Sequence, residues 1–335
     1  MLKKIKFTEI EKKDWDFYID SINIYSPYYS SWSIDYYLKF GNITNLSYIL
    51  LDGKTCIAVV PLAISSNNLS FGQTYCPSPF VNTNLREANR RKIYQNIFED
   101  IDAMIKNAKV QKYFFSTHPF QGFNAQKNNI ALNNYFELIK YASSIKIVNT
   151  LILDLTRTKE QLSNGLSKYH RKNIKKVENK KINFKIINSN NSLEEVNKIF
   201  FDYKNKHFDS ASKITRPVAT WEHMKNCIID DKADLFYLEK DNVKISYLFC
   251  GKNKYFAFGW SQVNIDEYEK EFMPRHYLEW MAIQYYKITN KKFYEIGERY
   301  YDIIKSEYSE KELSISYFKE KFGSPTYPKA YFVKA

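Results

Sequence analysis

The order of predicted elements occurs twice along the chain, and this repeat constrains the fold more than any other feature. In the first half, a strand pair, a further strand, a helix over residues 85–109 and a short strand follow one another. In the second half, a helix over residues 193–208 precedes a strand pair, a third strand, a helix over residues 276–289 and a closing strand. Because each half contains enough elements for its own layers, the order predicts two similar α/β domains with mixed sheets.

Local signals support both halves of this repeat. An Asp-Gly pair at residues 52–53 and a polar Asp-Asn pair at residues 241–242 stand where each strand pair turns, as expected of tight hairpins. In the first half, the strand-like runs cover residues 46–51 and 55–64. The helix that follows has an isoleucine at every fourth position from Ile93 to Ile105, which is the spacing of one helix face.

The length of the chain agrees with two domains. Its 335 residues exceed the roughly 100–200 residues that one hydrophobic core usually organises. Residues 148–155 are strand-like and are followed by a polar helix, so we place the hinge between the halves there. The expected domains are residues 1–147 and 148–335.

The charge balance favours polyanionic partners without choosing among them. Fifty Lys and Arg against 37 Asp and Glu leave a formal charge of +13. RNA, a phosphorylated precursor and an anionic membrane surface all fit such a charge. An AT-rich genome also enriches a protein in Lys, Asn and Ile without selection for binding, so the charge fits a second interpretation equally well.

Cysteine spacing and hydropathy indicate a cytoplasmic protein. The four cysteines form no CxxC pair, so neither a metal site nor a disulfide framework is expected. The basic N-terminus is followed by EKKDWDFY, which lacks the apolar core of a signal peptide. No window approaches the roughly twenty apolar residues of a membrane span.

Ordered motifs in the second half resemble a known family. The first is a basic helix in LSKYHRKNIKKVENKKINFKI, and the others are HYLEWMAIQYYKITNKKFYEIGERYY and LSISYFKEKFGSPTYPKAYFV. In this order they are similar to the closing segments of Fem-type (FemAB-like) aminoacyl and peptidyl transferases of cell-envelope assembly, within the GNAT superfamily. The resemblance covers residues 150–333, whereas the first half matches only in plan and in its aromatic SPYYSSWS segment. It implies two tandem GNAT-like domains and acyl transfer.

One departure from ordinary GNAT enzymes bears on the donor. Acetyl-CoA-dependent members have a Q/R-x-x-G-x-G/A turn whose N–H groups and helix dipole hold the pyrophosphate. The loop before His276 reads YEKEFMPRHYLEW and contains no glycine, so a side chain such as Arg275 would have to hold CoA. Fem-type enzymes also lack this turn and use aminoacyl-tRNA, so the resemblance favours a tRNA donor and leaves acyl-CoA as the alternative.

The basic helix has two interpretations. Lys168, Arg171, Lys172 and Lys175 share one helical face, as on any solvated amphipathic helix. The resemblance implies instead that Arg171, with Lys168, binds the phosphates of a nucleotide-linked or lipid-linked acceptor through bidentate contacts.

The resemblance places Lys319 near the reaction centre. In Fem-type enzymes the Lys of an FK pair lies there, and this chain has Phe318-Lys319. Aminolysis of an ester passes through an oxyanion that a fixed ammonium stabilises. Without the resemblance, Lys319 reads as a surface lysine. In the first domain, Lys39 and Trp32 are assigned to substrate binding on a looser match, and Phe318 is assigned to it beside Lys319.

Direct attack by the acceptor amine is the expected mechanism. The five histidines are dispersed, and no Ser/His/Asp arrangement is legible. Glu295, Glu298 or Tyr300 could take the proton, since they lie at or just past a strand end. The alternative for Glu298 is a solvated turn.

These observations predict an acyltransferase that forms an amide on an amino group of an envelope precursor or amino sugar. Its partners would be a phosphorylated precursor or nucleotide sugar, tRNA and the inner membrane surface, with no tightly bound cofactor and no metal. One alternative is an acyl-CoA-dependent N-acyltransferase acting on a nucleotide sugar or surface glycan. Another is a non-catalytic RNA-binding protein, although the sequence shows no recognised RNA module.

Overall fold

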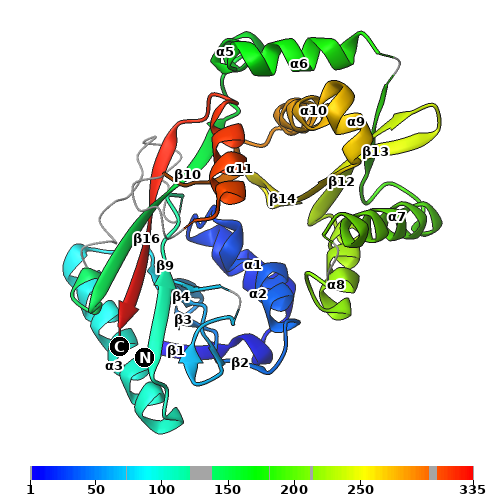
Figure 1. The fold of residues 1–335 in the computed structure, drawn as a ribbon. Coiled ribbons are helices and arrows are strands. Elements are labelled where there is room, and N and C mark those ends of the chain that lie inside the picture. The colour runs from blue at the N-terminus through cyan, green and yellow to red at the C-terminus, as the bar shows by residue number, and fades with distance from the viewer. Residues whose placement is uncertain are drawn as a thin grey trace. The chain divides into compact units, whose positions relative to one another are not determined.

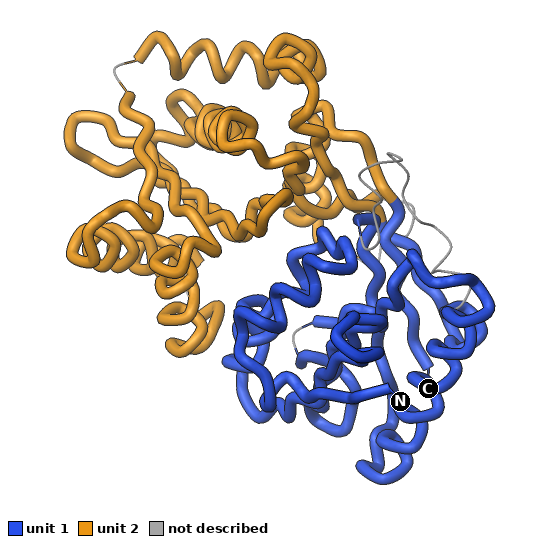
Figure 2. Tube along the Cα trace, turned by 180° about the vertical axis from the view of Figure 1, so that it is seen from behind, with its two compact units in different colours: residues 1–148, 328–335 blue, residues 149–327 orange. Residues whose placement is uncertain are grey.

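The structure is a computed structural model that describes residues 2–72, 74–120, 138–180, 182–211, 214–301 and 308–334. The chain divides into two compact units, residues 1–148 with 328–335 and residues 149–327 (Figure 2). We call them unit 1 and unit 2. The polar segment containing NAQKNN lies outside the described residues.

Unit 1 is built from two groups of strands with helices around them (Figure 1). One sheet has the order β1-β3-β4-β8, and the second group has the order β16-β9-β6-β5-β2, in which β16 spans Thr326–Lys334 and β7 also pairs with β9. Its strands are β1 (Leu2–Lys6), β2 (Ile43–Asn45), β3 (Tyr48–Asp52), β4 (Thr55–Val60), β5 (Ala63–Ser65), β6 (Asn68–Leu69), β7 (Cys76–Pro77), β8 (Phe80–Val81) and β9 (Lys112–Ser116). Its helices are η1 (Phe7–Glu9), α1 (Lys12–Ser21), η2 (Pro27–Tyr29), α2 (Ser31–Leu38) and α3 (Glu87–Ala108).

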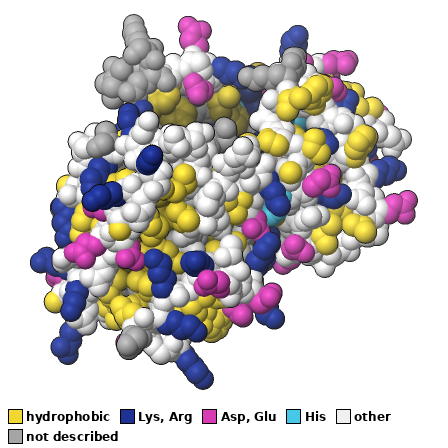
Figure 3. All heavy atoms as spheres, turned by 90° about the horizontal axis from the view of Figure 1, so that it is seen from below, with side chains coloured by type: hydrophobic (Ala, Val, Ile, Leu, Met, Phe, Trp, Pro, Cys, Tyr) yellow, Lys and Arg dark blue, Asp and Glu magenta, His cyan; other side chains and the backbone are white. Residues whose placement is uncertain are grey.

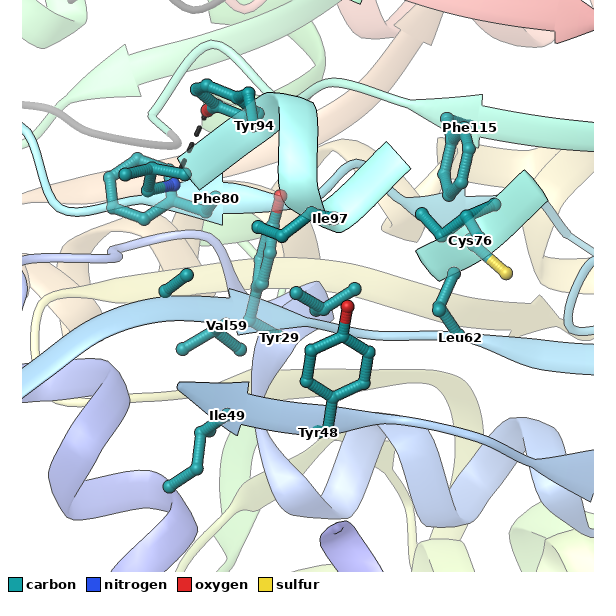
Figure 4. Close-up of a cluster of buried hydrophobic side chains, with 14 of the residues drawn as sticks. Tyr29, Tyr48, Ile49, Val59, Leu62, Cys76, Phe80, Tyr94, Ile97 and Phe115 are labelled. Atoms are coloured by element: carbon teal, nitrogen blue, oxygen red, sulfur yellow. Dashed lines mark hydrogen bonds between the residues drawn. The ribbon is translucent and has the colours of Figure 1, made fainter. Parts of the chain in front are cut away.

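The core of unit 1 lies between α3 and the β3–β4 hairpin (Figure 4). Ile97 of α3 and Val59 of β4 are buried there. Tyr94 of α3 places its hydroxyl where the Val81 N–H donates to it at 3.3 Å. The predicted isoleucine face is therefore the buried face of α3.

Unit 2 contains one mixed sheet with helices packed on it. The strand order is β11-β12-β13-β14-β15-β10, and β16 follows β10 in the same hydrogen-bonded sheet. The strands are β10 (Ser144–Asp154), β11 (Asn183–Ile187), β12 (Ala233–Lys240), β13 (Val243–Lys252), β14 (Phe256–Asn264) and β15 (Phe293–Arg299). The helices are α5 (Lys159–Gly165), α6 (Lys168–Glu178), α7 (Leu193–Ala211), α8 (Val218–Ile229), α9 (Asp266–Phe272), α10 (Pro274–Ile288) and α11 (Glu310–Glu320).

Two strands pass from one unit to the other. β10 leaves unit 1 at Val148 and pairs with β15 from Asn149 onward, and β16 (Thr326–Lys334) enters unit 1 at Pro328 and pairs with β9. The predicted hinge at residues 148–155 is therefore mostly strand, and the change of unit falls inside it. Residues 328–335, expected in the second domain, belong to unit 1.

Most of the predicted elements are present with small shifts. Both hairpins form, and Asp241 and Asn242 adopt the positive φ angles (50° and 63°) that a tight hairpin turn requires. The predicted strand over residues 55–64 ends at Val60 and resumes as β5 after Pro61. Helix α8 was not predicted from the sequence, and the stretch expected to be a loop before His276 contains α9.

The surface carries charges of both signs. On the face shown in Figure 3, Lys and Arg side chains are spread in ones and twos among acidic, polar and apolar residues. Within the described ranges, no helix is both long and apolar enough to cross a membrane.

Candidate functional site

A pocket of about 550 Å³ in unit 2 is the candidate site. It lies between the end of β14 and helices α9, α10 and α11, with one wall residue each from α7, β13 and β15. The lining residues are Ser210, Leu248, Gly259, Trp260, Ser261, Gln262, Val263, Asn264, Asp266, Glu269, Arg275, Glu279, Ile296, Lys311, Ser314, Ile315, Phe318 and Lys319.

The pocket opens where two neighbouring strands separate. β14 pairs in parallel with β15 only over Phe256–Phe258, although it continues along β13 as far as Asn264. The register of β13 and β14 shifts at Trp260, which stands as an extra residue of a β-bulge. Such bulges bend a strand and commonly lie beside active sites. β14 therefore has no ladder partner in β15 beyond Phe258, and residues 259–264 line the pocket there.

Lys319 of α11 lines this pocket. Ser309 caps α11 by accepting a hydrogen bond from the Glu312 N–H, and this fixes where the helix begins. The ammonium of Lys319 lies against Gly297 of β15, where an added Cβ would come within 2.3 Å of Nζ. Burial lowers the pKa of Lys319, and the carboxylates of Glu279, Glu295 and Glu298 partly offset this.

Glu279 of α10 provides a buried carboxyl group in the same pocket. Only 4% of the residue is exposed, and the Tyr294 hydroxyl donates to its Oε1 at 2.7 Å. Burial raises the pKa of Glu279 to about 7, against smaller lowering effects from Tyr294 and Lys319. Gly259 lies beside this pair, and an added Cβ there would stand 3.1 Å from the Tyr294 oxygen. The pocket thus contains a cationic group and a carboxyl group that titrates near neutral pH.

Two further carboxylates come from β15. Glu295 is buried and accepts a hydrogen bond from the Thr150 hydroxyl at 2.6 Å. Glu298 accepts one from Tyr300, whose ring stacks on Tyr308 with centroids 4.2 Å apart. Neither Glu298 nor Tyr300 lines the pocket, although Glu298 is close enough to influence Lys319.

Arg275 and Phe318 form one wall of the pocket. The guanidinium of Arg275 lies 4.8 Å from the centroid of the Phe318 ring, and its Nε is 2.8 Å from Oε1 of Glu269. Behind Phe318, the rings of His170 of α6 and His276 of α10 meet edge to face, with centroids 4.5 Å apart. Burial lowers the pKa of His170 to about 4 and that of His276 to about 3, so both rings are neutral at pH 7.

Arg171 is engaged with the backbone. Its guanidinium donates to the carbonyl oxygens of Ser163, Asn164 and Leu166, at 3.4, 3.2 and 2.5 Å, at the end of α5. Carbonyls at a helix C-terminus lack intrahelical partners, although that of Ser163 also accepts from the Leu166 N–H, so Arg171 caps α5. Arg171 and the exposed Lys168 do not line the pocket. Their assignment to the acceptor stays a prediction.

The two assigned residues of the first half lie in unit 1. Trp32 is buried in α2, and Lys39 is exposed at the C-terminal end of that helix. Neither lies in the unit 2 pocket. Of the predicted site residues, Lys319, Phe318 and Arg275 are the ones that share it.

Glu279, Tyr294 and the role of Gly297 were not predicted from the sequence. One signal for Glu279 was present, since it stands three and four positions before Ala282 and Ile283 in the apolar face of α10, where a carboxylate is rare. No local pattern indicates Tyr294. Among the described residues, no group of three or more His, Cys, Asp or Glu side chains could hold a metal ion.

Comparison with known proteins identifies the fold. No protein-family model matches the sequence, and no curated protein matches it. A solved structure titled as FemX matches with a TM-score of 0.70 and 11% identity, over 99% of this chain and 97% of that one. The C-terminal domain (DUF2156) of a putative lysylphosphatidylglycerol synthetase from Agrobacterium fabrum matches with a TM-score of 0.62 and 11% identity, over 97% and 92% of the two chains.

A tandem GNAT protein from the clavulanic acid biosynthesis pathway matches with a TM-score of 0.54 and 10% identity, over 100% of this chain and 98% of that one. At these identities the likeness concerns the fold alone. It confirms the predicted fold class, which is two tandem GNAT-like domains of mixed α/β structure, and it confirms the Fem-type resemblance at the level of the fold.

Proposed function

We propose that this protein is an N-acyltransferase that takes an aminoacyl group from tRNA and transfers it to an amine of a phosphorylated envelope precursor or amino sugar. The proposal rests on one observation: Lys319 and Glu279 line the same pocket, at the point where β14 and β15 separate. The fold is shared with a structure titled as FemX.

Lys319 supplies positive charge where negative charge develops. Attack of an amine on an ester carbonyl forms an N–C bond and pushes an electron pair onto the carbonyl oxygen. An ammonium held in a buried site stabilises that oxyanion more than a solvated one, because little water screens it and its position is preset. Gly297 makes this position available, since no side chain stands between β15 and Lys319.

Glu279 accepts the proton of the attacking amine. Its pKa of about 7 matches a general base that works near neutral pH. The Tyr294 hydroxyl holds one carboxyl oxygen and leaves the other for the substrate. When the tetrahedral intermediate collapses, the ester C–O bond breaks, and the ribose hydroxyl leaves with the proton that Glu279 accepted from the amine. The products are an amide and a deacylated tRNA.

An acyl-CoA donor is the second candidate, and the separation of β14 from β15 favours it. β14 pairs with β15 only as far as Phe258, and a strand that diverges from its neighbour in this way can pair with the amide groups of an extended ligand. Against it, α10 begins with Met273 in a left-handed conformation and Pro274, which has no N–H, and Arg275 is paired with Glu269. A pyrophosphate therefore lacks the N–H groups that the glycine-rich turn provides.

A transfer assay tests the function. Purified protein is mixed with a radiolabelled aminoacyl-tRNA pool or with radiolabelled acetyl-CoA, and label reaching a UDP-linked amino sugar is measured. We expect transfer from aminoacyl-tRNA, and a loss of roughly 10²–10³ in kcat in K319M. Lys321→Met is the control, because Lys321 lies two residues further at the end of α11 and outside the pocket.

Other outcomes separate the alternatives. Transfer from acetyl-CoA alone, with calorimetric binding of acetyl-CoA, assigns the protein to the CoA-dependent class. RNA binding with no transfer from either donor supports the non-catalytic alternative. Equal activity of K319M and wild type removes Lys319 from the mechanism.

A further inference from the structure

The outer face of α6 carries a concentrated positive charge that the pocket does not use. Its eleven residues include five basic side chains and one acidic side chain, Glu178. The helix therefore has a net charge of +4, compared with +13 for the whole chain. The basic side chains are Lys168, Arg171, Lys172, Lys175 and Lys176.

Three of these lysines are free to meet a ligand. Lys168, Lys172 and Lys175 are exposed, and none is within ion-pair distance of an acidic side chain in the described parts of the chain. In contrast, Lys176 donates to the carbonyl of Glu271, and Arg171 caps α5. The spacing of four and three residues places the free lysines on one face, in a row of about 10 Å at 1.5 Å per residue.

The opposite face of α6 is fully used by packing. His170, Asn173, Ile174 and Val177 are buried, and α6 packs on the outside of α10 (Figure 1). The amide of Asn173 reaches Nε2 of His276 at 3.5 Å. The free face therefore contains cations without an apolar stripe that could enter a lipid layer.

The first turn of α6 also touches the back of the pocket wall. The Tyr169 hydroxyl donates to the sulfur of Met273 at 2.9 Å, two residues before Arg275. A ring nitrogen of His170 is 3.1 Å from the carbonyl oxygen of Phe318. Because Arg275 and Phe318 line the pocket, a ligand lying along α6 has one end next to it.

We infer that the row formed by Lys168, Lys172 and Lys175 binds the phosphate backbone of RNA and holds the RNA part of the donor beside the pocket. A nucleic-acid strand carries a phosphate about every 3.4 Å along its axis, so a row of about 10 Å meets about three of them. Each lysine neutralises one phosphate and releases a counterion, so binding is steeply salt-dependent. The inference rests on the proposed function only in taking RNA as the carrier of the acyl group.

The test measures binding without chemistry. Fluorescence anisotropy follows a labelled, unacylated tRNA pool at 50, 100 and 200 mM KCl with wild type and with K168E/K172E/K175E. We expect the triple variant to bind at least about 10-fold more weakly at 100 mM KCl. The negative slope of log K against log salt concentration should also become shallower by about 2–3. Circular dichroism checks that the helices of the triple variant remain folded. If the reversed charges unfold α6, the neutral variant K168Q/K172Q/K175Q is used in the same test.

K13E/K54E/K92E is the matched control. These three lysines are exposed on unit 1 and unpaired among the described residues, so the variant loses the same net charge elsewhere. Equal weakening by both triple variants overturns the inference, because net charge alone then explains binding. Failure of wild type to bind tRNA also overturns it.

Two more arms identify the source of the phosphates. UDP should not displace the tRNA. If UDP displaces it and also abolishes the difference in tRNA affinity between wild type and the triple variant, the row of lysines binds the acceptor instead. Membrane binding is tested by sedimentation with phosphatidylcholine vesicles that contain phosphatidylglycerol. If wild type binds these vesicles through the α6 lysines and does not bind tRNA, the inference is overturned in favour of a lipid surface. K319M should bind tRNA like wild type, so failure of the proposed chemistry and failure of this surface are separable.

Discussion

The contact of Lys319 with Gly297 shows how one residue without a side chain shapes the candidate site. Gly297 has a φ of +131°, which other residues rarely adopt, and its Cα borders the Lys319 ammonium. Burial lowers the pKa of this ammonium, and the charges of Glu279, Glu295 and Glu298 act in the opposite direction and favour its charged form. Position and charge of Lys319 thus both depend on β15.

Gly297→Ala should displace Lys319. The new Cβ would lie 2.3 Å from Nζ, and the φ of +131° adds backbone strain of about 1–3 kcal/mol. We expect both a lower melting temperature and a loss of transfer approaching that of K319M, measured by thermal unfolding and kcat. Gly53→Ala is the control, because Gly53 also has a positive φ but no atom within 4 Å, so only stability should fall. Full activity in Gly297→Ala would contradict the placement of Lys319.

Glu279 should set the lower limb of the pH–rate profile. Its pKa of about 7 means that it is protonated below neutral pH and then cannot accept a proton, so kcat should rise with pH around 7. Glu279→Gln should flatten this limb and lower the rate. A profile with the same midpoint in the variant would assign the titration to another group.

The same carboxyl group affects stability with the opposite pH dependence. Its pKa in the folded state, about 7, exceeds the reference value of 4.5, so the folded protein binds the extra proton between these values. The stabilisation is complete below about pH 4.5 and is lost as pH rises through 7. The difference of about 2.5 units corresponds to an upper value of about 3 kcal/mol. Urea unfolding of wild type and Glu279→Gln at pH 5 and 8 measures it.

At the scale of elements, α5 and α6 are joined by a side chain that the sequence suggested for another task. The Arg171 guanidinium donates to three carbonyls at the end of α5, and a planar fork suits this arrangement better than an ammonium does. Ser167 caps α6 at the same junction by accepting from the His170 N–H. The junction is therefore rigid, and it presents the row of lysines on α6.

Arg171→Ala and Arg171→Lys should both destabilise this junction. Loss of the fork leaves carbonyl oxygens unpaired, at a cost of about 1–2 kcal/mol in unfolding free energy. Hydrogen exchange of residues 159–166 should rise in both variants. If unfolding is unchanged while the KM for the acceptor rises in Arg171→Ala and recovers in Arg171→Lys, Arg171 anchors phosphate instead.

At the scale of the whole molecule, the last strand, β16, completes the core of unit 1. β16 pairs with β9, from Tyr331 opposite Ser116 to Lys334 opposite Tyr113. Ala330 and Phe332 are buried in the core of unit 1, more than two hundred residues beyond most of the other members of that core. Unit 1 is therefore completed only by the end of the chain.

Phe332→Ala should weaken unit 1 selectively. Truncation of a buried Phe costs about 3–5 kcal/mol, and this core lies in unit 1. Limited proteolysis followed by mass spectrometry should show earlier cleavage within residues 1–148 than in wild type, with residues 149–327 protected as before. Equal loss of protection in both units would show that they unfold as one.

Many of the features predicted from the sequence depend on residues that are close together in the chain. The isoleucine face of α3, the turns at residues 52–53 and 241–242, and the repeated order of elements depend on neighbours within a few residues, and they appear nearly as expected. The FK pair indicated Lys319 through family resemblance. The ends of strands were less accurate, because Pro61 interrupts the strand expected over residues 55–64.

Only the tertiary structure decided which groups meet. Glu279, Tyr294 and Lys319 come from α10, β15 and α11, and no local pattern brings them together. Their pKa values depend on burial, which a sequence does not state. Arg171 could bind a phosphate or cap a helix by its chemistry, and the position of α5 placed three carbonyls within its reach. Local propensity thus determined the elements of this chain, whereas long-range packing selected which side chains form its site.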